Sequence, residues 1–171
     1  GTDMLPADRD PGRAAPGAGD ALKRLPLDSP FGFLTVVERD GKIVALEWGG
    51  RASGKPDAVL VEAKRQLEQY FAKKRTHFDL PLAPEGSDDE KRLWARMTKI
   101  PYGQTATYGE LARELGQMPR ALGQGCGRNP IPIIIPCHRV VSADGSLTGY
   151  SAPGGVETKR RLLQFEGALL L

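Results

Sequence analysis

The sequence has few of the residues on which several classes of protein depend. Its 171 residues include only two cysteines, Cys126 and Cys137, and two histidines, His77 and His138. Two cysteines do not make a disulfide framework, and the same four residues leave little from which to build a zinc site. No stretch approaches the roughly 18 apolar residues of a membrane-spanning helix. We therefore expect a soluble cytoplasmic protein with reduced thiols, no bound metal and no cofactor.

Charge and composition divide the chain. Residues 1–89 contain 13 Lys and Arg against 15 Asp and Glu, whereas residues 90–171 contain 11 against 6. The basic second half is therefore the part better suited to bind a polyanion such as nucleic acid. Residues 1–24 are dominated by Gly, Pro, Ala and Asp at their start. That composition predicts a disordered leader or a cloning remnant, and not a signal peptide.

The first half is expected to form a small α/β unit. Apolar residues over 31–48 predict two strands joined by a tight turn at Asp40-Gly41. Residues 57–73 place their apolar side chains at helical spacing. The stretch 80–86 contains two prolines and a glycine, which predicts a linker to the second half.

The second half is expected to be mainly helical. Helical spacing of apolar residues predicts helices over 88–99 and 156–166. Between them, Thr107 and Glu110 fit a capping box that would start a short helix. A further short helix follows at once, with Pro119 near its first turn. Two short helices separated by a tight turn predict a helix-turn-helix.

A wing would complete this helix-turn-helix. Asp144-Gly145 is a hairpin signal between the apolar pair Val140-Val141 and Leu147. The expected second unit is therefore a winged helix-turn-helix.

Three glycines, Gly123, Gly125 and Gly127, fall inside the second short helix. Each costs a helix roughly 1 kcal/mol relative to alanine, so some use should compensate for them. Close approach to another backbone, including that of a nucleic acid, is one such use. Tight packing between helices is the other, and the residues alone leave both open. A phosphate-binding loop is disfavoured because no Lys-Ser or Lys-Thr pair follows.

The pair Cys137-His138 is the main candidate for chemistry. It follows the apolar run 131–135, which predicts a buried strand and a cysteine held at the end of it. A thiol attacks as its thiolate, so a neighbouring base must take the proton. Adjacent side chains on a strand point to opposite faces, so a water or a local bend would have to connect the two.

An imidazole base is usually oriented by a carboxylate. Glu166, Asp144 and Glu157 are the candidates, and their positions in the sequence do not choose among them. The alternative is that Cys137 is an inert core thiol, since buried cysteine is common. We expect that structural role for Cys126, which has no such neighbour.

Three stretches of the second half closely resemble the O6-alkylguanine-DNA alkyltransferases (methylated-DNA–protein-cysteine methyltransferases) of the bacterial type. The stretches are IPYGQTATYGELA (100–112), PRALGQGCGRNPIPIIIPCHRVV (119–141) and GYSAPGGVETKRRLLQFEG (149–167). The resemblance implies an α+β protein. It would have a small ribonuclease-H-like domain over 25–84 and a winged helix-turn-helix domain over 85–171 that binds DNA and transfers the alkyl group.

The same resemblance implies a single-turnover repair reaction. Cys137 would irreversibly take the alkyl group from O6 of guanine, with O4 of thymine as an open second target. His138 would act as the base through a water and would be held by Glu166. The target base must leave the duplex, because O6 lies inside the stack. The implied partner is double-stranded DNA carrying O6-alkylguanine, bound by a monomer.

Further residues take roles from the resemblance. Arg120 would enter the duplex in place of the flipped nucleotide, and Tyr108 would crowd the target phosphate. Asn129 would be a hinge between the recognition helix and the active-site segment. Ala121 and Gly125 would let the recognition helix approach the minor groove, which favours the DNA-contacting use of the glycines.

The substrate pocket would be formed by Tyr108, Val140, Tyr150 and Ser151. Ser151 would bond O6, and backbone groups of Cys137 and Val140 would read the guanine edge. Two other functions compete with this one. Alkyltransferase-like proteins bind the lesion but usually have Trp at the cysteine position, which Cys137 argues against. A winged-helix transcription factor would need polar side chains facing base edges, and this recognition helix offers few.

Overall fold

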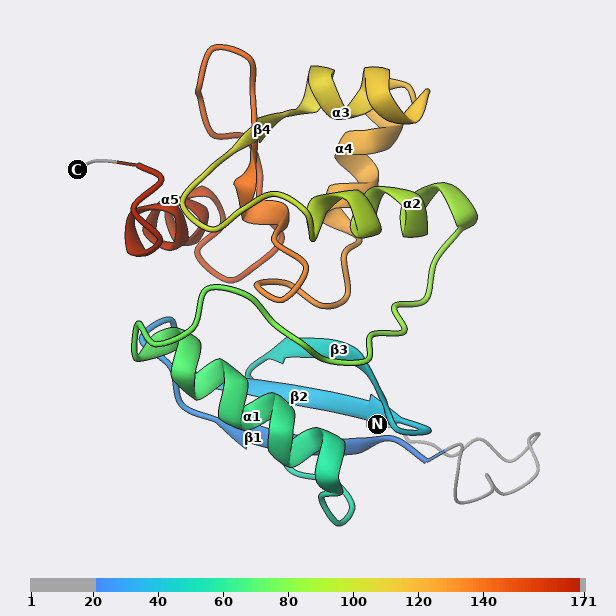
Figure 1. The fold of residues 1–171 in the computed structure, drawn as a ribbon, viewed down its shortest axis with the longest axis vertical. Helices are drawn as coiled ribbons and strands as arrows, with labels where there is room; N and C mark the ends of the chain where they lie inside the picture. Colours follow the sequence, from blue (N-terminus) through green and yellow to red (C-terminus); the bar gives the residue numbers. More distant parts are fainter. Residues whose placement is uncertain (1–20, 170–171) are drawn as a thin grey trace.

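The computed structural model describes residues 21–169. They form two halves, one built on a sheet and the other mainly helical, that lie against each other (Figure 1). Most of the predicted leader, residues 1–20, lies outside the described residues. Lys23 and Arg24 are not part of a leader, because they begin the first strand. No helix within 21–169 is long and apolar enough to cross a membrane.

The first half consists of three strands and one helix: β1 (Lys23–Leu27), β2 (Leu34–Arg39), β3 (Lys42–Trp48) and α1 (Ala58–Phe71). The strands are antiparallel in the order β1-β2-β3, and α1 covers one face (Figure 1). The predicted hairpin is confirmed, with Asp40 and Gly41 at φ of 54° and 77° in a two-residue turn whose twist matches the strands. The edge strand β1 was not predicted.

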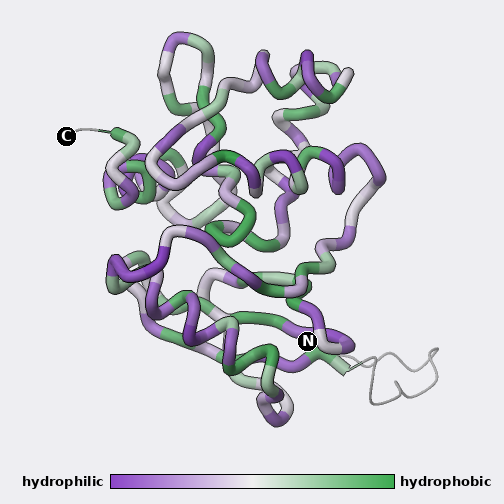
Figure 2. The backbone as a smooth tube through the Cα atoms, viewed as in Figure 1, coloured by the Kyte–Doolittle hydropathy of each residue, from purple (hydrophilic) through white to green (hydrophobic). Residues whose placement is uncertain are grey.

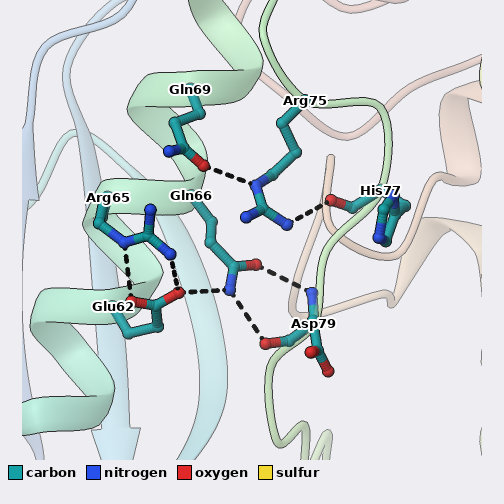
Figure 3. A network of polar contacts seen from close by, with 7 residues as sticks. All are labelled: Glu62, Arg65, Gln66, Gln69, Arg75, His77 and Asp79. Atoms are coloured by element: carbon teal, nitrogen blue, oxygen red, sulfur yellow. Dashed lines mark hydrogen bonds and ion pairs between the residues drawn. The ribbon is translucent and has the colours of Figure 1, made fainter.

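The segment after α1 is tied back to that helix by a polar network (Figure 3). The buried amide of Gln66 donates to the carbonyl of Asp79 (3.0 Å) and accepts from its N–H (2.9 Å). Arg75 donates to the side chain of Gln69 (2.9 Å) and to the carbonyl of His77 (3.1 Å). The segment that follows α1 is therefore fixed to the helix at Arg75 and at Asp79.

The linker predicted over 80–86 is not a free connection. The N–H of Ile43 on β3 donates to the carbonyl of Pro81, and the N–H of Ala83 donates to the carbonyl of Ile43, both at 2.8 Å. On the same strand, the N–H of Leu46 donates to the carbonyl of Pro130 in the second half (2.9 Å). One continuous apolar core runs through both halves, and hydrophobic segments meet between them (Figure 2).

The second half contains four helices, a 3-10 turn and two short strands: α2 (Asp88–Met97), β4 (Ala106–Thr107), α3 (Tyr108–Leu115), α4 (Pro119–Gly127), η2 (Cys137–Arg139), β5 (Val140–Val141) and α5 (Val156–Phe165). The predicted capping box of Thr107 and Glu110 starts α3, and Gly116 ends it with a φ of 64°. Pro119 opens α4, and α3 and α4 pack against each other as the predicted helix-turn-helix.

Two strand predictions in this half are wrong. The run 131–135 is a buried tight turn, in which the N–H of Ile135 donates to the carbonyl of Ile131 (2.9 Å) and Ile133 has a φ of 72°. The prolines that flank and interrupt it lack the N–H that a strand ladder needs. The expected wing is a turn at Asp144-Gly145, without a second strand among the described residues 142–150. Instead, β5 pairs in parallel with β4.

Candidate active site

Cys137 begins η2 directly after the buried turn. Its N–H donates to the carbonyl of Ile135 (2.8 Å), which continues the turn into the 3-10 helix. The residue is 5% exposed. In a 3-10 helix successive side chains are about a third of a turn apart, so Cys137 and His138 are not forced to opposite faces as on a strand. The sequence left open whether a water or a local bend would connect the two side chains, and the 3-10 turn is such a bend.

Asn129 fixes this turn from the end of α4. Its side-chain amide donates to the carbonyl of Ile135 (2.8 Å), and its side-chain oxygen accepts from the N–H of Ile131 (2.9 Å). The side chain also lies beside the Cys137 thiol. The hinge position expected for Asn129 thus corresponds to a clamp across the turn, joining the recognition helix to the cysteine.

Glu166 is the carboxylate next to His138. The imidazole Nε2 lies 2.9 Å from Glu166 Oε2, and both side chains are fully buried. The contact is at ion-pair distance without the angle of a hydrogen bond, and Nδ1 has no partner among the described residues. The other two candidates lie on the surface, Asp144 in an exposed turn and Glu157 on the outer face of α5.

Two further residues hold Glu166, and the sequence did not identify either. Arg139 makes a bidentate pair, Nε to Oε1 at 2.8 Å and Nη2 to Oε2 at 2.9 Å. It also donates from Nη1 to the carbonyl of Ile100 (2.6 Å). The hydroxyl of Tyr70, from α1 in the first half, donates to Oε2 at 2.6 Å. The carboxylate therefore receives contacts from two separate segments, η2 and α1.

Burial sets the protonation states of the three central groups. It raises the pKa of the Cys137 thiol, an effect that neighbouring Asn129 and Lys159 oppose only in part. It also lowers the pKa of His138, against the raising influence of Glu166. Burial would raise the pKa of Glu166, but His138 and Arg139 outweigh it and bring the value to about 2. At neutral pH the site thus holds a thiol, a neutral imidazole and a carboxylate.

A cavity of about 490 Å³ opens beside Cys137, between α4 and the loop before α5. The predicted pocket residues Tyr108, Tyr150 and Ser151 line it. The Tyr150 hydroxyl is buried, without a hydrogen-bond partner among residues 21–169. Val140 is fully buried in β5 and its side chain does not line the cavity. The pocket role expected of it belongs to its backbone and stays a prediction.

Lys159 is a buried cation that contacts two residues of the cavity wall, Tyr108 and Thr148, and the sequence did not point to it. Its Nζ lies 3.3 Å from the Tyr108 hydroxyl and 3.2 Å from the carbonyl of Thr148. The signal that could have found it is helical spacing. Lys159 and Glu166 stand seven residues apart on the face of α5 that also buries Leu162 and Leu163.

The exposed face of α4 presents mostly small residues, together with Arg120 and Gln124. Arg120, Ala121, Gly123 and Gly127 are exposed, and added Cβ atoms at Gly123 and Gly127 would meet no atom within 4 Å. Gly125 is different, because it is buried against α2. Its expected role at the DNA surface is therefore wrong, and it serves the helix packing that the residues alone had left open.

Among the described residues, no three His, Cys, Asp or Glu side chains gather in a way that could hold a metal ion. The site thus has a buried thiol that faces a cavity beside an exposed helix, and the next residue belongs to a buried imidazole–carboxylate pair.

Two family models match the chain. The ribonuclease-like domain of 6-O-methylguanine DNA methyltransferase matches residues 24–84, and the DNA binding domain of the same enzyme matches residues 88–168. The chain belongs to the 6-O-methylguanine DNA methyltransferase family.

Curated relatives carry the name methylated-DNA–protein-cysteine methyltransferase. One from Methanosarcina acetivorans is 50% identical over 109 residues, which cover 63% of this chain and 69% of the relative. One from Mycobacterium bovis is 41% identical over 149 residues, which cover 82% of this chain and 89% of the relative.

Solved structures of the family show the same fold. The O6-methylguanine methyltransferase of Mycobacterium tuberculosis is 38% identical with a TM-score of 0.76, over 88% of this chain and 96% of that one. Its complex with DNA matches with a TM-score of 0.74 at 40% identity, over 84% and 91% of the two chains. The expected α+β fold is thereby confirmed, as are DNA binding and methyltransferase activity in direct DNA repair.

Proposed function

We propose that Cys137 is the residue that accepts the alkyl group, taken from O6 of guanine in double-stranded DNA. The single observation that carries this is the position of Cys137, which lines the 490 Å³ cavity and directly precedes the buried pair of His138 and Glu166 in the chain. Cys126 lines the same cavity, and burial raises its pKa as it raises that of Cys137, but no histidine follows it in the sequence. A buried thiol needs a base to take its proton, so Cys137 is the better candidate.

His138 takes the thiol proton through a bridging water. Glu166 lies against Nε2, which favours the tautomer with its proton on that atom and leaves the lone pair on Nδ1. A lowered pKa keeps His138 neutral and able to act as a base at physiological pH. Since Glu166 is ionised, the imidazolium that forms during the reaction has a counter-charge beside it.

The transfer is a displacement at the alkyl carbon. The Sγ–C bond forms as the C–O6 bond breaks, the thiol proton leaves by way of His138, and the departing guanine regains one proton. The net change is one alkyl group gained by sulfur and one proton gained by guanine. Because a thioether is a poor leaving group and the site offers no second nucleophile to remove it, each molecule acts once. O4 of thymine offers a similar leaving group and is a second candidate target.

The target base must be turned out of the duplex to reach the cavity. Arg120, exposed in the first turn of α4, is suited to occupy the space it leaves, since a plug recovers part of the unstacking cost. Tyr108 stands at the start of α3 and at the edge of the cavity, where it can crowd the target phosphate. Ala121 and the neighbouring glycines are small, so the exposed face of α4 can fit into a narrow groove of the DNA.

Tyr150 and Ser151 line the cavity on the side of the loop before α5, which supports a role for Ser151 as the residue that would bond O6. The backbone of Cys137 and Val140 would read the guanine edge. Residues 25–84 would act as a support domain and residues 85–171 as the domain that binds DNA and performs transfer. One molecule suffices, since every group in this scheme comes from a single chain.

Substitution of the two cysteines tests the assignment. Cys137→Ser should abolish transfer of a labelled methyl group from O6-methylguanine duplex, while leaving binding to that duplex measurable. Cys126→Ser, a matched change at the same cavity, should retain transfer. Transfer by Cys137→Ser, or its loss in Cys126→Ser alone, would refute the assignment. A wild-type protein that binds the lesion without taking the methyl group would be a lesion-binding module only.

A further inference from the structure

Tyr70 reaches from the first half of the chain into the site of the second half. It lies in the last turn of α1, whose end sits beneath α5 (Figure 1). The residue is fully buried, and its hydroxyl donates to Glu166 Oε2 at 2.6 Å across 96 positions of sequence. We infer that Tyr70 is a positioning residue for alkyl transfer, through which the ribonuclease-like half controls the base His138. This inference rests on the proposed role of His138.

The Tyr70 hydroxyl contacts Oε2, the same carboxylate oxygen of Glu166 that lies against His138. Oε2 of Glu166 receives the Tyr70 hydroxyl, one Arg139 nitrogen and the Nε2 of His138, whereas Oε1 receives only Arg139. Each donor draws negative charge from the oxygen, so the hydroxyl moderates the field that Oε2 exerts on the imidazole. Arg139 is fixed independently by the carbonyl of Ile100, and it defines the plane of the carboxylate. The Tyr70 hydroxyl then reduces the negative charge that Oε2 presents to His138.

Several other groups face this pair. The titratable and charged side chains around His138 and Glu166 are Tyr70, Tyr102, Cys137, Arg139, Tyr150 and Lys159. Tyr102 is the useful comparison. Its ring lies 6.1 Å from that of Tyr70 and 5.8 Å from the Arg139 guanidinium. No hydrogen bond joins its hydroxyl to Glu166 in the described structure.

Aromatic rings from both halves hold Tyr70 in place. Its ring packs against Phe71 and Phe78 of the first half and against Tyr102 and Phe165 of the second, with centroids 5.1–6.1 Å apart. One turn earlier on α1, Gln66 clamps the following segment through Asp79 (Figure 3). The hydroxyl therefore has little freedom to leave the carboxylate.

Loss of the hydroxyl has a defined direction. In Tyr70→Phe the charge on Oε2 is no longer shared with that donor, so the imidazolium form of His138 is better stabilised and its pKa rises. Because the neutral imidazole is the active form, the acid limb of the transfer rate should move to higher pH. On that acid limb the rate should fall roughly tenfold, the order expected for one hydrogen bond to a charged group, whereas well above the His138 midpoint, where both proteins hold a neutral imidazole, it should change little. Affinity for the lesion duplex should not change.

The titration of His138 can be measured without activity. The sequence has only two histidines, and the exposed His77 serves as an internal reference in an NMR titration of the ring C–H signals. Tyr70→Phe should raise the His138 midpoint and leave His77 unchanged, whereas Tyr102→Phe should move neither. A second variant carries 3-fluorotyrosine at position 70, which is a stronger hydrogen-bond donor of similar size. It should lower the His138 midpoint, and it tests the inference even if Tyr70→Phe does not fold.

An unmoved His138 midpoint in both position-70 variants, or equal effects of Tyr102→Phe, would overturn the inference and leave Tyr70 a packing residue. The wild-type transfer assay is read separately. If wild type transfers methyl and the midpoints do not move, only this inference fails. If wild type transfers nothing, the proposed function fails, whatever the titration gives.

Discussion

The indole Nε1 of Trp94 donates a hydrogen bond of 3.0 Å to the carbonyl oxygen of Gly125, and both groups are buried. This contact joins α2 to the recognition helix α4. A Cβ added at Gly125 would come within 2.9 Å of Leu93 Cδ2. Gly125 is therefore the position at which α4 can approach α2, and the orientation of the DNA-facing side of α4 follows from it.

We expect Gly125→Ala to destabilise the protein by about 1–3 kcal/mol, because the new methyl group overpacks a tight helix contact. Gly123→Ala on the same helix should leave stability unchanged or raise it by up to about 1 kcal/mol, since its surroundings are open. It should instead weaken binding to DNA. Urea unfolding and duplex titration of both variants measure this contrast, and equal stability of the two would contradict the packing role.

Glu166 predicts how stability depends on pH. Its pKa in the folded protein is about 2, below the ~4.3 of an unfolded chain. The carboxylate therefore contributes stability above pH ~4.3, which is lost as the pH falls toward 2. The lowered pKa of His138 acts with the same sign, because the unfolded chain takes up a proton near ~6.5 while the folded one resists it.

We accordingly expect the free energy of unfolding to decline below pH ~6.5 and more steeply below ~4.3. Glu166→Gln should be less stable at neutral pH by about 3 kcal/mol, since it leaves Arg139 without its counter-charge, and should lose the steep acid part. Glu157→Gln, an exposed change on the same helix, is the control. An acid profile in Glu166→Gln that parallels wild type would disprove the assignment.

Local signals in the sequence were enough for much of the fold. The Asp40-Gly41 turn and the capping box at Thr107 depend on neighbouring residues, and both were predicted. The run 131–135 was misjudged because five apolar or proline residues look like a strand core. The prolines, together with the positive φ of Ile133, make it a turn instead.

The site was predictable only in part for a related reason. The Cys137-His138 pair stands out in the sequence, and the resemblance supplied Glu166. Nothing local indicates that Tyr70 contacts Glu166 across 96 residues, or that Gly125 faces inward while Gly123 faces outward. Such facts depend on how α1, α2 and α4 pack, which periodicity alone does not fix.

Arg120→Ala tests the flipping step. If Arg120 occupies the space of the extruded base, its removal should weaken binding to O6-methylguanine duplex by about tenfold, because part of the unstacking cost is no longer recovered. Binding to a single strand with the same lesion should change much less. Fluorescence anisotropy with both substrates at one salt concentration gives the comparison. Equal losses on the two would show that Arg120 contributes only charge.

The most direct test of the whole account is intact-protein mass spectrometry after exposure to excess O6-methylguanine duplex. We predict a gain of one methyl group per molecule, about 14 Da, with no further gain on longer exposure. Digestion should place it on the peptide that contains Cys137. A methyl group on Cys126, or an unchanged mass in a protein that binds the duplex, would contradict the central claim.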